Sequence, residues 1–449
     1  MMKSFLSLLM MFCGVAALLG AYGGRIELDK KSGQYKSGET ATCFVTLTKD
    51  GKPLKGVKAR CVIKWEGKQV EAKIFETTGK PVKFSYTGKK PGWVYFGFEV
   101  LGENGKPLRG DGVQRHRMKP TIVTEIGAIY APAQIRAGFE RPADFEEFWA
   151  ERRAKLDKLP IEPKLEPLPC DAKGVKLYTL TVPTLDEFPV TAYLAIPANA
   201  KPKSLPAHAT FLSWSACDAS KSAAINGAKS GYICLSATWH GRAVNMPKEW
   251  YNYKTTIKID GGLNGIRDRE SWCFSGMYYR VMRALDYLKT RPEWNGRDLV
   301  VSGGSLGGAQ SLAAAALDKD VTLAIVTVPG FCEFDAADTG HRGSHLLFKQ
   351  PIAREIAAGD RRAFVTVSYF DCVNFAPMVK CEIFMSTGGT DEQCAPSSVY
   401  AAYNALPATT KKEIFFNPKT GHYGQINASI APKIDALFKA VKVKPFDNK

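Results

Sequence analysis

The spacing of apolar positions changes once along this chain, close to residue 140. Over residues 25–125, apolar and polar positions alternate, and turn signals such as Asp50-Gly51 and Glu66-Gly67 separate the apolar runs. Alternation of this kind, with a turn about every ten residues, predicts an all-β sandwich of immunoglobulin-like type. Its clearest strands are expected at residues 40–48, 58–65, 81–86 and 93–101. We expect no catalytic residue in this segment.

Residues 126–142 form a proline-containing connector, after which the apolar spacing becomes helical and predicts a helix at residues 143–159. From there strands and helices alternate, with an irregular polar insertion around residues 335–360. Strands are expected at residues 176–182, 189–196, 207–214, 232–238, from 299, 322–328, 381–386 and 412–416, and helices at 276–289 and 428–441. This alternation predicts a mostly parallel, eight-stranded sheet with helices on both faces, which is the α/β-hydrolase layout, over residues 143–449.

The stretch LVVSGGSLGG at residues 299–308 marks a sharp turn in this second domain. A β-branched run, a glycine pair, one serine and a second glycine pair precede the alanine-rich residues 309–317, which predicts strand, turn and helix. Gly303, Ser305 and Gly307 fit the G-x-S-x-G pattern of a nucleophile elbow. Ser305 is therefore the candidate nucleophile, and a glycine-rich loop that ends a buried strand is the alternative.

A serine nucleophile needs a base, and in this fold the chain order is nucleophile, acid, histidine. His341, His345 and His422 follow Ser305 in the sequence. His422 lies in a glycine-flanked loop directly after the last expected strand, which makes it the candidate base. The i, i+4 spacing of His341 and His345 could hold a metal, but no third ligand is evident in the sequence, so we interpret both as surface or cap residues and predict no metal site.

The acid is expected in the loop after the seventh strand, where GGTDE occupies residues 388–392. Asp391 is the first choice and Glu392 the fallback, while a turn or helix-cap role for Asp391 is the alternative. The backbone N–H groups of Leu306 and Trp214 are expected to stabilise the oxyanion. A triad of this kind works through an acyl-enzyme and needs no cofactor.

The N-terminus favours an exported protein, periplasmic or extracellular. Residues 1–24 combine a lysine, an apolar core and small residues, as a secretory signal peptide does, and no later stretch is apolar enough to span a membrane. The net charge of +17 and the pI of 9.3 suggest attraction to acidic glycans, whereas export argues against nucleic acid as a partner.

Cys43 and Cys61 form either a disulfide or two core thiols, and the sequence leaves both open.

Five segments resemble the family of acetyl xylan esterases and cephalosporin C deacetylases, over residues 141–438. They are RPADFEEFW at 141–149, MRALDYLKTRPEW at 282–294, GGSLGG at 303–308, YFDCVNFAPMVKCEIF at 369–384 and TDEQCAPSSVYAAYN at 390–404. The resemblance places the family's triad on Ser305, Asp391 and His422. It implies an α/β-hydrolase that removes acetyl groups from carbohydrate. Because such enzymes often form hexamers, it also leaves a homo-oligomer open.

Four positions near the expected site depart from the family's pattern. The chain has His240-Gly241-Arg242 where the family has arginine-glycine-glutamine, and Leu212-Ser213-Trp214 where it has histidine-glycine-tyrosine. Leu306 replaces glutamine and Tyr423 replaces glutamate. These departures make His240, Arg242 and Tyr423 candidate substrate contacts and leave an acidic sugar open as substrate.

Together these features favour an exported serine esterase that removes O-acetyl groups from xylan-type or other acetylated glycans. A serine peptidase of the prolyl oligopeptidase type shares the fold and the elbow, and is one alternative. Those peptidases usually carry tyrosine after the serine and a β-propeller, whereas this chain has Leu306 and a short β segment. The second alternative is a glycan-binding protein without activity, which the presence of all three triad residues argues against.

Overall fold

The computed structural model describes residues 22–108, 120–213, 218–251, 265–334, 336, 339–343, 358–422 and 425–443. Predictions on residues 1–21 of the signal segment, Trp214, His345 and Tyr423 lie outside these described residues. The chain divides into two compact units. The first contains residues 1–135 together with 388–397 and 416–429, and the second contains residues 136–387, 398–415 and 430–449.

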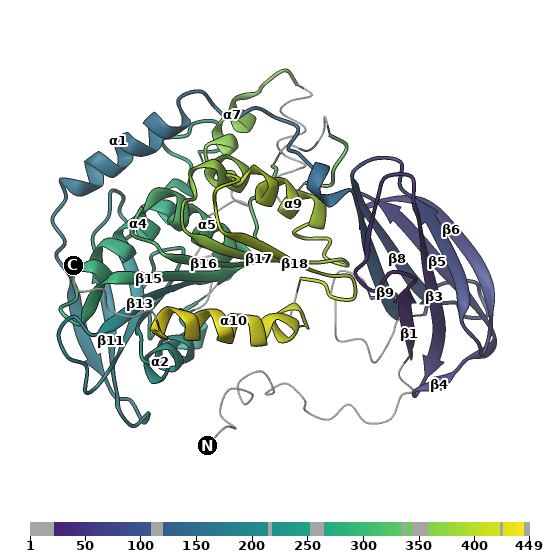
Figure 1. Cartoon of the computed structure of the whole chain (residues 1–449), viewed down its shortest axis with the longest axis horizontal. Coiled ribbons are helices and arrows are strands. Elements are labelled where there is room, and N and C mark those ends of the chain that lie inside the picture. The colour runs from purple at the N-terminus through teal and green to yellow at the C-terminus, as the bar shows by residue number, and fades with distance from the viewer. Residues whose placement is uncertain are drawn as a thin grey trace. The chain divides into compact units, whose positions relative to one another are not determined.

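The N-terminal part of the first unit is built from two sheets, as the alternating pattern predicts (Figure 1). One sheet contains β1 (Tyr22–Leu28), β3 (Thr40–Lys49), β4 (Lys52–Pro53) and β7 (Val82–Thr87). The other has the order β2 (Gln34–Tyr35), β9 (Thr124–Tyr130), β8 (Gly92–Val100), β5 (Lys55–Trp65) and β6 (Lys68–Thr78). Apolar side chains from both sheets share one buried core, which is the arrangement of a β-sandwich.

Turn chemistry explains the hairpins of this sandwich. Asp50 and Gly51 have φ values of 51° and 77°, and Glu66 and Gly67 have 49° and 74°. Two successive residues with positive φ are characteristic of the hairpin turns whose twist matches that of the flanking strands. The two turns predicted from the sequence are therefore confirmed.

Two strands of the sandwich, β6 and β9, carry a weak sequence signal. Most side chains of β6 are exposed, so its period-two pattern has few apolar positions. Strand β9 is short and lies largely inside residues 126–142, where the sequence indicates a connector. Its last five residues are all buried, because it pairs with the fully buried strand β8.

Cys43 and Cys61 are free thiols, and both side chains are fully buried. They lie on β3 and β5, which belong to different sheets and are not neighbouring strands. Burial raises the pKa of both thiols, so each remains protonated and behaves as a small apolar core residue.

The second unit contains a large twisted sheet (Figure 1). Its nine described strands have the order β10 (Lys164–Leu168), β11 (Val175–Val182), β12 (Val190–Pro197), β14 (Ile233–Ala237), β13 (Leu205–Phe211), β15 (Trp294–Gly304), β16 (Leu323–Thr327), β17 (Glu382–Gly388) and β18 (Lys412–Asn417). The last residues of β17 and β18 belong to the first compact unit. Neighbouring strands from β14 to β17 are parallel, whereas β10 to β12 are antiparallel.

The eight-strand prediction is one strand short. The additional strand is β10, an edge strand with mostly exposed side chains and a proline at position 167. An edge strand of this kind needs neither two buried faces nor a complete set of N–H donors, so the sequence shows no apolar run.

Helices cover both faces of this sheet (Figure 1). Helices α4 (Ser275–Thr290) and α5 (Leu306–Leu317) lie on one face, and α2 (Lys221–Lys229) and α10 (Gln425–Val443) lie on the other. The remaining helices are α1 (Phe145–Asp157), α7 (Arg362–Ser368), α8 (Cys372–Phe375) and α9 (Pro396–Ala405), with 3-10 turns at Pro132–Gln134, Lys248–Trp250 and Ala376–Met378. Among the described residues, no helix has the length and apolar character needed to cross a membrane.

Candidate active site

The segment around Ser305 has the geometry of a nucleophile elbow. Strand β15 ends at Gly304, helix α5 begins at Leu306, and Ser305 between them has φ 56° and ψ −121°. A serine adopts this backbone conformation only under strain, which is typical of a residue whose position matters for function. The strand, turn and helix predicted from the sequence are therefore confirmed.

The glycines of the elbow are required by close backbone contacts. A Cβ atom on Gly303 would lie 2.3 Å from the carbonyl oxygen of Gly307, and one on Gly307 would lie 2.3 Å from that of Phe211. Any side chain at these positions would separate α5 from the ends of β15 and β13. The G-x-S-x-G pattern therefore has a packing cause on both sides of Ser305.

Hydrogen bonds hold the backbone of Ser305 on both sides. Its N–H donates to the carbonyl of Thr327 at 3.0 Å, and its carbonyl accepts from the N–H of Gly330 at 2.8 Å. Leu306 is the first residue of α5, and the N–H groups of a first helical turn have no acceptor within the helix. The Leu306 N–H is thus available for an oxyanion, and the Trp214 N–H lies outside the described residues.

A buried aspartate braces the segment that follows β16. Val328, Phe331 and Glu333 all have positive φ, so this segment is strained along its length. The Asp371 carboxylate accepts hydrogen bonds from the N–H groups of Glu333 at 3.0 Å and Phe334 at 2.7 Å, and also from its own helix α8 at Val373. Asp371 lies in the family-like motif at residues 369–384, but sequence reasoning gave it no role.

The pKa of Asp371 is raised to about 7, mainly because the side chain is completely buried. The backbone N–H donors oppose this shift, and the nearby Glu333 adds to it. The strained segment next to Ser305 is therefore hydrogen-bonded to a carboxyl group that changes its protonation state near neutral pH.

The sequence predicts a surface or cap role for His341, and the surface role is wrong. Its side chain is buried, and Nδ1 lies 3.0 Å from Oε1 of the fully buried Glu333. A buried carboxylate needs a partner, and the histidine supplies one. His341 therefore has a structural role, because it satisfies the buried carboxylate of Glu333 in the segment that follows β16. His345, which the sequence suggested as a second metal ligand, lies outside the described residues.

Asp391 and His422 form a buried pair in the first compact unit. Nδ1–H of His422 donates to Oδ2 of Asp391 at 2.9 Å, and the two side chains are 5% and 0% exposed respectively. The other carboxylate oxygen, Oδ1, accepts from the N–H groups of Gln393 at 2.8 Å and Cys394 at 2.9 Å. These bonds fix the orientation of the carboxylate, which in turn fixes the imidazole ring.

The pKa of His422 reflects two opposing effects. Burial alone would lower it, but the Asp391 carboxylate and the adjacent Cys394 together raise it well above its ordinary value of 6.5. The ring is therefore a stronger proton acceptor than a free imidazole, which is what a general base for a serine hydroxyl requires.

The segments that carry this pair contact each other directly. We call residues 388–397 the acid loop and residues 416–422 the histidine loop. The N–H of Thr390 donates to the carbonyl of Thr420 at 2.9 Å, and that of Gly389 donates to Asn417 at 2.8 Å. A Cβ on Gly388 would lie 2.3 Å from the Thr420 oxygen, so the glycine allows this approach.

Glu392, the fallback acid, has a different partner. Its Oε1 atom lies 2.8 Å from Nζ of Lys64, on strand β5. Of the two neighbouring carboxylates, Asp391 is therefore the one that contacts His422. Both of these residues belong to the first compact unit, whereas Ser305 belongs to the second.

Cys394 gives this site a third chemically active group. Ligand atoms of Asp391, Cys394 and His422 all lie within 4.8 Å of one another, and all three residues are buried. This set could in principle hold a metal ion. Each carboxylate oxygen of Asp391 is already engaged in hydrogen bonds within the unit, and His422 Nδ1 is one of the donors. The arrangement thus matches an oriented acid and base without a metal.

His240 and Arg242 lie directly after β14. Nδ1 of His240 accepts the N–H of Arg242 at 3.1 Å, so a neutral ring carries its proton on Nε2. The Arg242 guanidinium carbon is 5.9 Å from the ring centroid of Trp250. This loop therefore presents a histidine donor and a cation beside an aromatic ring.

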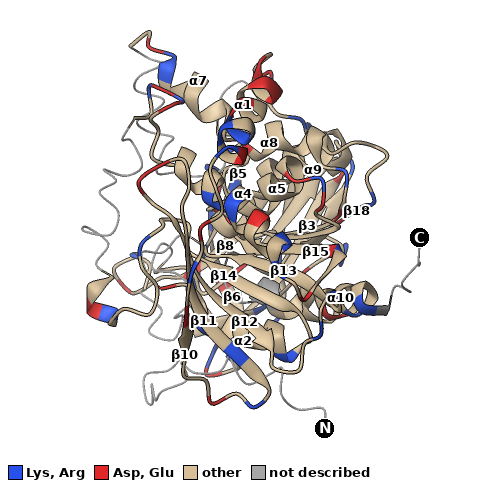
Figure 2. Ribbon diagram, turned by 90° about the vertical axis from the view of Figure 1, so that its left-hand side faces the viewer, with Lys and Arg blue, Asp and Glu red and all other residues tan. Residues whose placement is uncertain are grey.

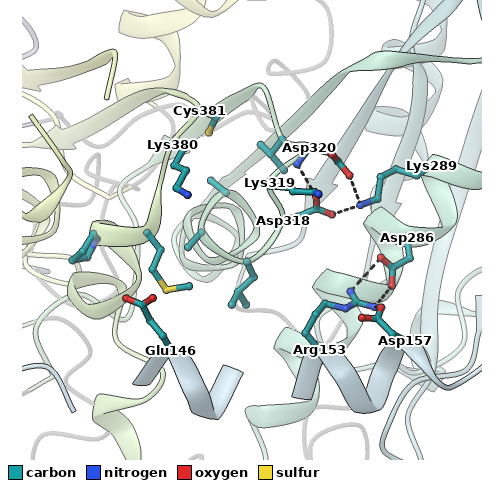
Figure 3. Close-up of a pocket in the computed structure, with 16 residues that line it drawn as sticks. Glu146, Arg153, Asp157, Asp286, Lys289, Asp318, Lys319, Asp320, Lys380 and Cys381 are labelled. Atoms are coloured by element: carbon teal, nitrogen blue, oxygen red, sulfur yellow. Dashed lines mark hydrogen bonds and ion pairs between the residues drawn. The ribbon is translucent and has the colours of Figure 1, made fainter. Parts of the chain in front are cut away.

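A pocket of about 510 Å³ lies at the opposite end of α5 from Ser305 (Figure 3). Twelve helical residues separate the two ends, which is about 18 Å at 1.5 Å per residue. Several of its charged side chains pair with one another, as Lys289 does with Asp318 and Asp320. We therefore do not assign this pocket to the reaction.

Figure 2 shows basic and acidic positions interspersed along the elements.

Comparison with known proteins identifies the family. The family model described as "Acetyl xylan esterase (AXE1)" matches residues 133–434. The acetyl esterase Axe7A of Xylanibacter ruminicola is 26% identical over 371 residues, covering 78% of this chain and 75% of that protein. That alignment covers more of the chain than residues 133–449 contain, so it extends into the N-terminal strands.

Two solved structures share the fold. The acetyl xylan esterase from Paenibacillus sp. R4 is 25% identical with a TM-score of 0.60, and 69% of this chain covers 98% of it. Acetyl xylan esterase 1 from Thermoanaerobacterium sp. JW/SL YS485 is 20% identical with a TM-score of 0.58, and 69% of this chain covers 97% of it. With an α/β-hydrolase fold and a match over most of its length, this chain belongs to the acetyl xylan esterase family and is a carboxylic ester hydrolase.

Proposed function

We propose that this chain is an exported serine esterase that removes O-acetyl groups from carbohydrate through Ser305, His422 and Asp391. The observation that carries the proposal is the buried 2.9 Å contact between Asp391 and His422, in loops that follow β17 and β18. Strands β15 and β17 are both parallel to β16, so the elbow and the acid loop leave the same end of the sheet. Ligands of parallel sheets bind at that end.

The reaction follows from the roles of the three residues. The Ser305 hydroxyl attacks the acetyl carbonyl carbon, and its proton moves to Nε2 of His422. The resulting imidazolium is stabilised by the Asp391 carboxylate. The oxyanion accepts from the Leu306 N–H, and we assign the second donor to Trp214. His422 then gives this proton to the sugar oxygen as its bond to the acetyl carbon breaks, so the sugar leaves with a free hydroxyl and an acetyl-serine remains.

Water completes the cycle. His422 removes a proton from a water molecule that attacks the acetyl-serine, and the same proton returns to Ser305 as acetate leaves. Every proton transfer uses the same imidazole nitrogen. Protein groups alone supply the nucleophile, base and oxyanion donors of this scheme.

Carbohydrate is the proposed substrate because relatives of this family are named acetyl xylan esterases. His240, Arg242 and Tyr423 are the proposed substrate contacts. A cation next to Trp250 suits an acidic or decorated sugar, since the aromatic face can stack on a sugar ring while the guanidinium binds a carboxylate. We also propose that the N-terminal sandwich is immunoglobulin-like and that residues 1–24 direct export.

The two alternatives are not favoured. A prolyl oligopeptidase-type peptidase and an inactive glycan-binding protein would share parts of the site, but the family and its relatives are ester hydrolases. The alternatives nevertheless define the outcomes of the test below.

The test is acetate release by the purified mature protein from acetylated xylan, simple acetylated sugars, sialylated glycans and an aryl acetate, beside Ser305→Ala. Release by the wild type and none by the variant is the expected result. If the wild type cleaves peptides or bulkier esters but no acetate, the substrate assignment is wrong. If it cleaves nothing while binding glycans, the catalytic assignment is wrong.

A further inference from the structure

The acid and histidine loops belong to the same compact unit as the N-terminal sandwich. We propose that strands β5, β8 and β9 are positioning elements of the active site, which hold both loops in the geometry that lets Asp391 accept from His422. The inference rests on the proposed function, because that function makes these two residues the acid and the base. It assigns a role in the reaction to Trp93, Glu66 and Lys64.

Trp93 on β8 holds the start of the acid loop. Its indole Nε1–H donates to the carbonyl of Gly389 at 2.6 Å, and the side chain is fully buried. Gly389 precedes Asp391 by two residues. Trp93 and Tyr95 also pack against Ala395, so the tryptophan contacts the loop on both sides of the aspartate. A buried indole N–H needs a partner, and here the acid loop provides it.

Glu66 holds the end of the acid loop. The residue is 3% exposed. Its Oε1 atom accepts the backbone N–H of Trp93 at 2.7 Å, and its Oε2 atom accepts a hydrogen bond from the Ser397 hydroxyl at 2.7 Å. Ser397 is the last residue of the acid loop as defined above and the second residue of α9. Hairpin turns favour asparagine, aspartate or glycine at the position of Glu66, whose φ is 49°. A strained, buried glutamate at this position is therefore explained by its contacts rather than by the turn.

Lys64 contacts the middle of the acid loop. Its ammonium group lies 2.8 Å from the Glu392 carboxylate, directly after Asp391 in sequence. The two side chains are 25% and 10% exposed, so water screens this pair only in part. Trp93, Lys64 and Glu66 thus fix the loop before, at and after the aspartate.

Gly127 on β9 links the sandwich to both loops. Its N–H donates to the carbonyl of Pro418 in the histidine loop at 2.9 Å. A Cβ atom at this position would lie 1.8 Å from the carbonyl oxygen of Gly389 in the acid loop. Strand β9 therefore contacts both loops, which also bond to each other through Thr390 and Thr420.

These contacts matter for the reaction because of how Asp391 is held. Its Oδ1 atom accepts N–H groups from Gln393 and Cys394 within the acid loop, so the carboxylate moves with that loop. A displacement of the loop changes the distance to His422, and a misplacement of about 1 Å can lower a rate roughly 100-fold.

The first test compares two adjacent serines. Ser397→Ala removes the hydroxyl that donates to Glu66. Ser398→Ala is the matched control, because Ser398 is equally buried and its hydroxyl makes no hydrogen bond to any residue that the structure describes. Assays use the full chain, with active sites counted by a fluorophosphonate that labels the serine nucleophile.

For Ser397→Ala we expect kcat per titrated site to fall roughly 10- to 100-fold with little change in KM. The acidic limb of the pH profile should move to lower pH, because a looser Asp391 contact raises the pKa of His422 less. Ser398→Ala should match the wild type in both measurements. A purely structural role would reduce the number of titratable sites and leave kcat per site and the pH profile unchanged.

The second test uses two ion pairs on the same strand. Lys64→Met breaks the pair with Glu392, and Arg60→Met breaks a pair between β5 and β8 in which Arg60 Nε lies 2.6 Å from Glu99. Only Lys64→Met should lower kcat, and Lys64→Arg should restore it. Equal kcat in Lys64→Met and Arg60→Met, together with an unchanged Ser397→Ala, would overturn the inference.

Failure of the proposed function gives a different result. If the wild type releases no acetate, the proposed function fails, and amide hydrogen exchange then tests the positioning alone. Faster exchange in residues 388–397 of Ser397→Ala than of Ser398→Ala supports it, and equal exchange overturns it.

Discussion

Asp391 Oδ2 lies 2.9 Å from His422 Nδ1, and both side chains are buried in the first compact unit. Removing a carboxylate and an imidazole from water is costly unless each satisfies the other. The neighbouring Glu392 has a cation as its partner instead. The structure thus distinguishes two adjacent carboxylates that the sequence left as first and second choice.

Asp391→Asn should lower kcat by about 10,000-fold, because an amide holds the His422 ring in the wrong tautomer. Glu392→Gln should lose far less activity, since its carboxylate contacts Lys64. Acetate release by the two purified variants measures both effects. A larger loss in Glu392→Gln than in Asp391→Asn would contradict the assignment of the acid.

The pH profile should reflect the raised pKa of His422. The base must be neutral to accept the Ser305 proton, so kcat/KM should fall as pH decreases through the pKa of the folded protein. Because Asp391 and Cys394 raise this pKa above 6.5, the midpoint of the acidic limb should lie above that value. For stability the sign is opposite: the raised pKa stabilises the fold below pH 6.5, and this contribution is lost as pH rises through the pKa of the folded state. A midpoint below 6.5 in the rate profile would contradict the described pair.

Ser305→Gly should abolish activity and stabilise the protein. Relief of the backbone strain at φ 56° is worth about 1–3 kcal/mol, and the greater freedom of glycine in the unfolded chain offsets roughly 0.4–1 kcal/mol of that gain. We expect a net gain of about 1 kcal/mol in the free energy of unfolding, measured with urea. Ser305→Ala, which retains the strain, should be equally inactive but no more stable than the wild type.

Much of the second unit could be predicted from the sequence, because its signals are local. The elbow is a contiguous stretch within it, and the chain order of the fold then selected His422 and the loop of Asp391, which belong to the first unit. The edge strand β10 was missed, since a strand with mostly exposed side chains has no apolar pattern to detect.

The links between the sandwich and the two loops were not predictable in the same way. Trp93 and Gly389 are 296 positions apart, and Lys64 and Glu392 are 328 apart. In the sequence, Trp93 is an ordinary apolar residue of an expected strand. Glu66 carried the one local signal, since glutamate is unusual at the first position of a hairpin turn with positive φ.

The burial of two acids, Asp371 and Glu333, was also not predictable from the sequence. Asp371 and Glu333 are single acids between aromatic and apolar residues, and His341 lies in the polar insertion around residues 335–360, so no local pattern in the sequence indicates that these side chains serve one segment. Their burial depends on backbone N–H donors and on the histidine, which only the folded chain brings together.

Asp371→Asn should destabilise the fold. The Asp371 carboxylate accepts hydrogen bonds from backbone N–H groups, and in the variant the amide NH₂, itself a donor, would face one of these N–H groups and leave it without an acceptor. The cost is about 1–3 kcal/mol for an unsatisfied buried donor. The pKa of Asp371 is raised to about 7, so the wild type should lose stability as pH rises from about 4 to 7 while the variant should not. The deficit of the variant, measured by urea unfolding, should therefore shrink over that interval. A deficit that grows with pH would contradict the raised pKa.

Gly127→Ala should impair both stability and activity, and Gly23→Ala should impair neither. Both glycines lie in strands of the sandwich. A Cβ on Gly127 would lie 1.8 Å from the Gly389 oxygen, whereas the nearest atom to one on Gly23 is Thr48 Oγ1 at 3.4 Å. Relieving the overlap at Gly127 requires movement of the acid loop, with a loss of about 1–3 kcal/mol in the free energy of unfolding. If that loss appears while kcat per titrated site stays at the wild-type value, the loop tolerates displacement, and the sandwich stabilises the fold without positioning Asp391.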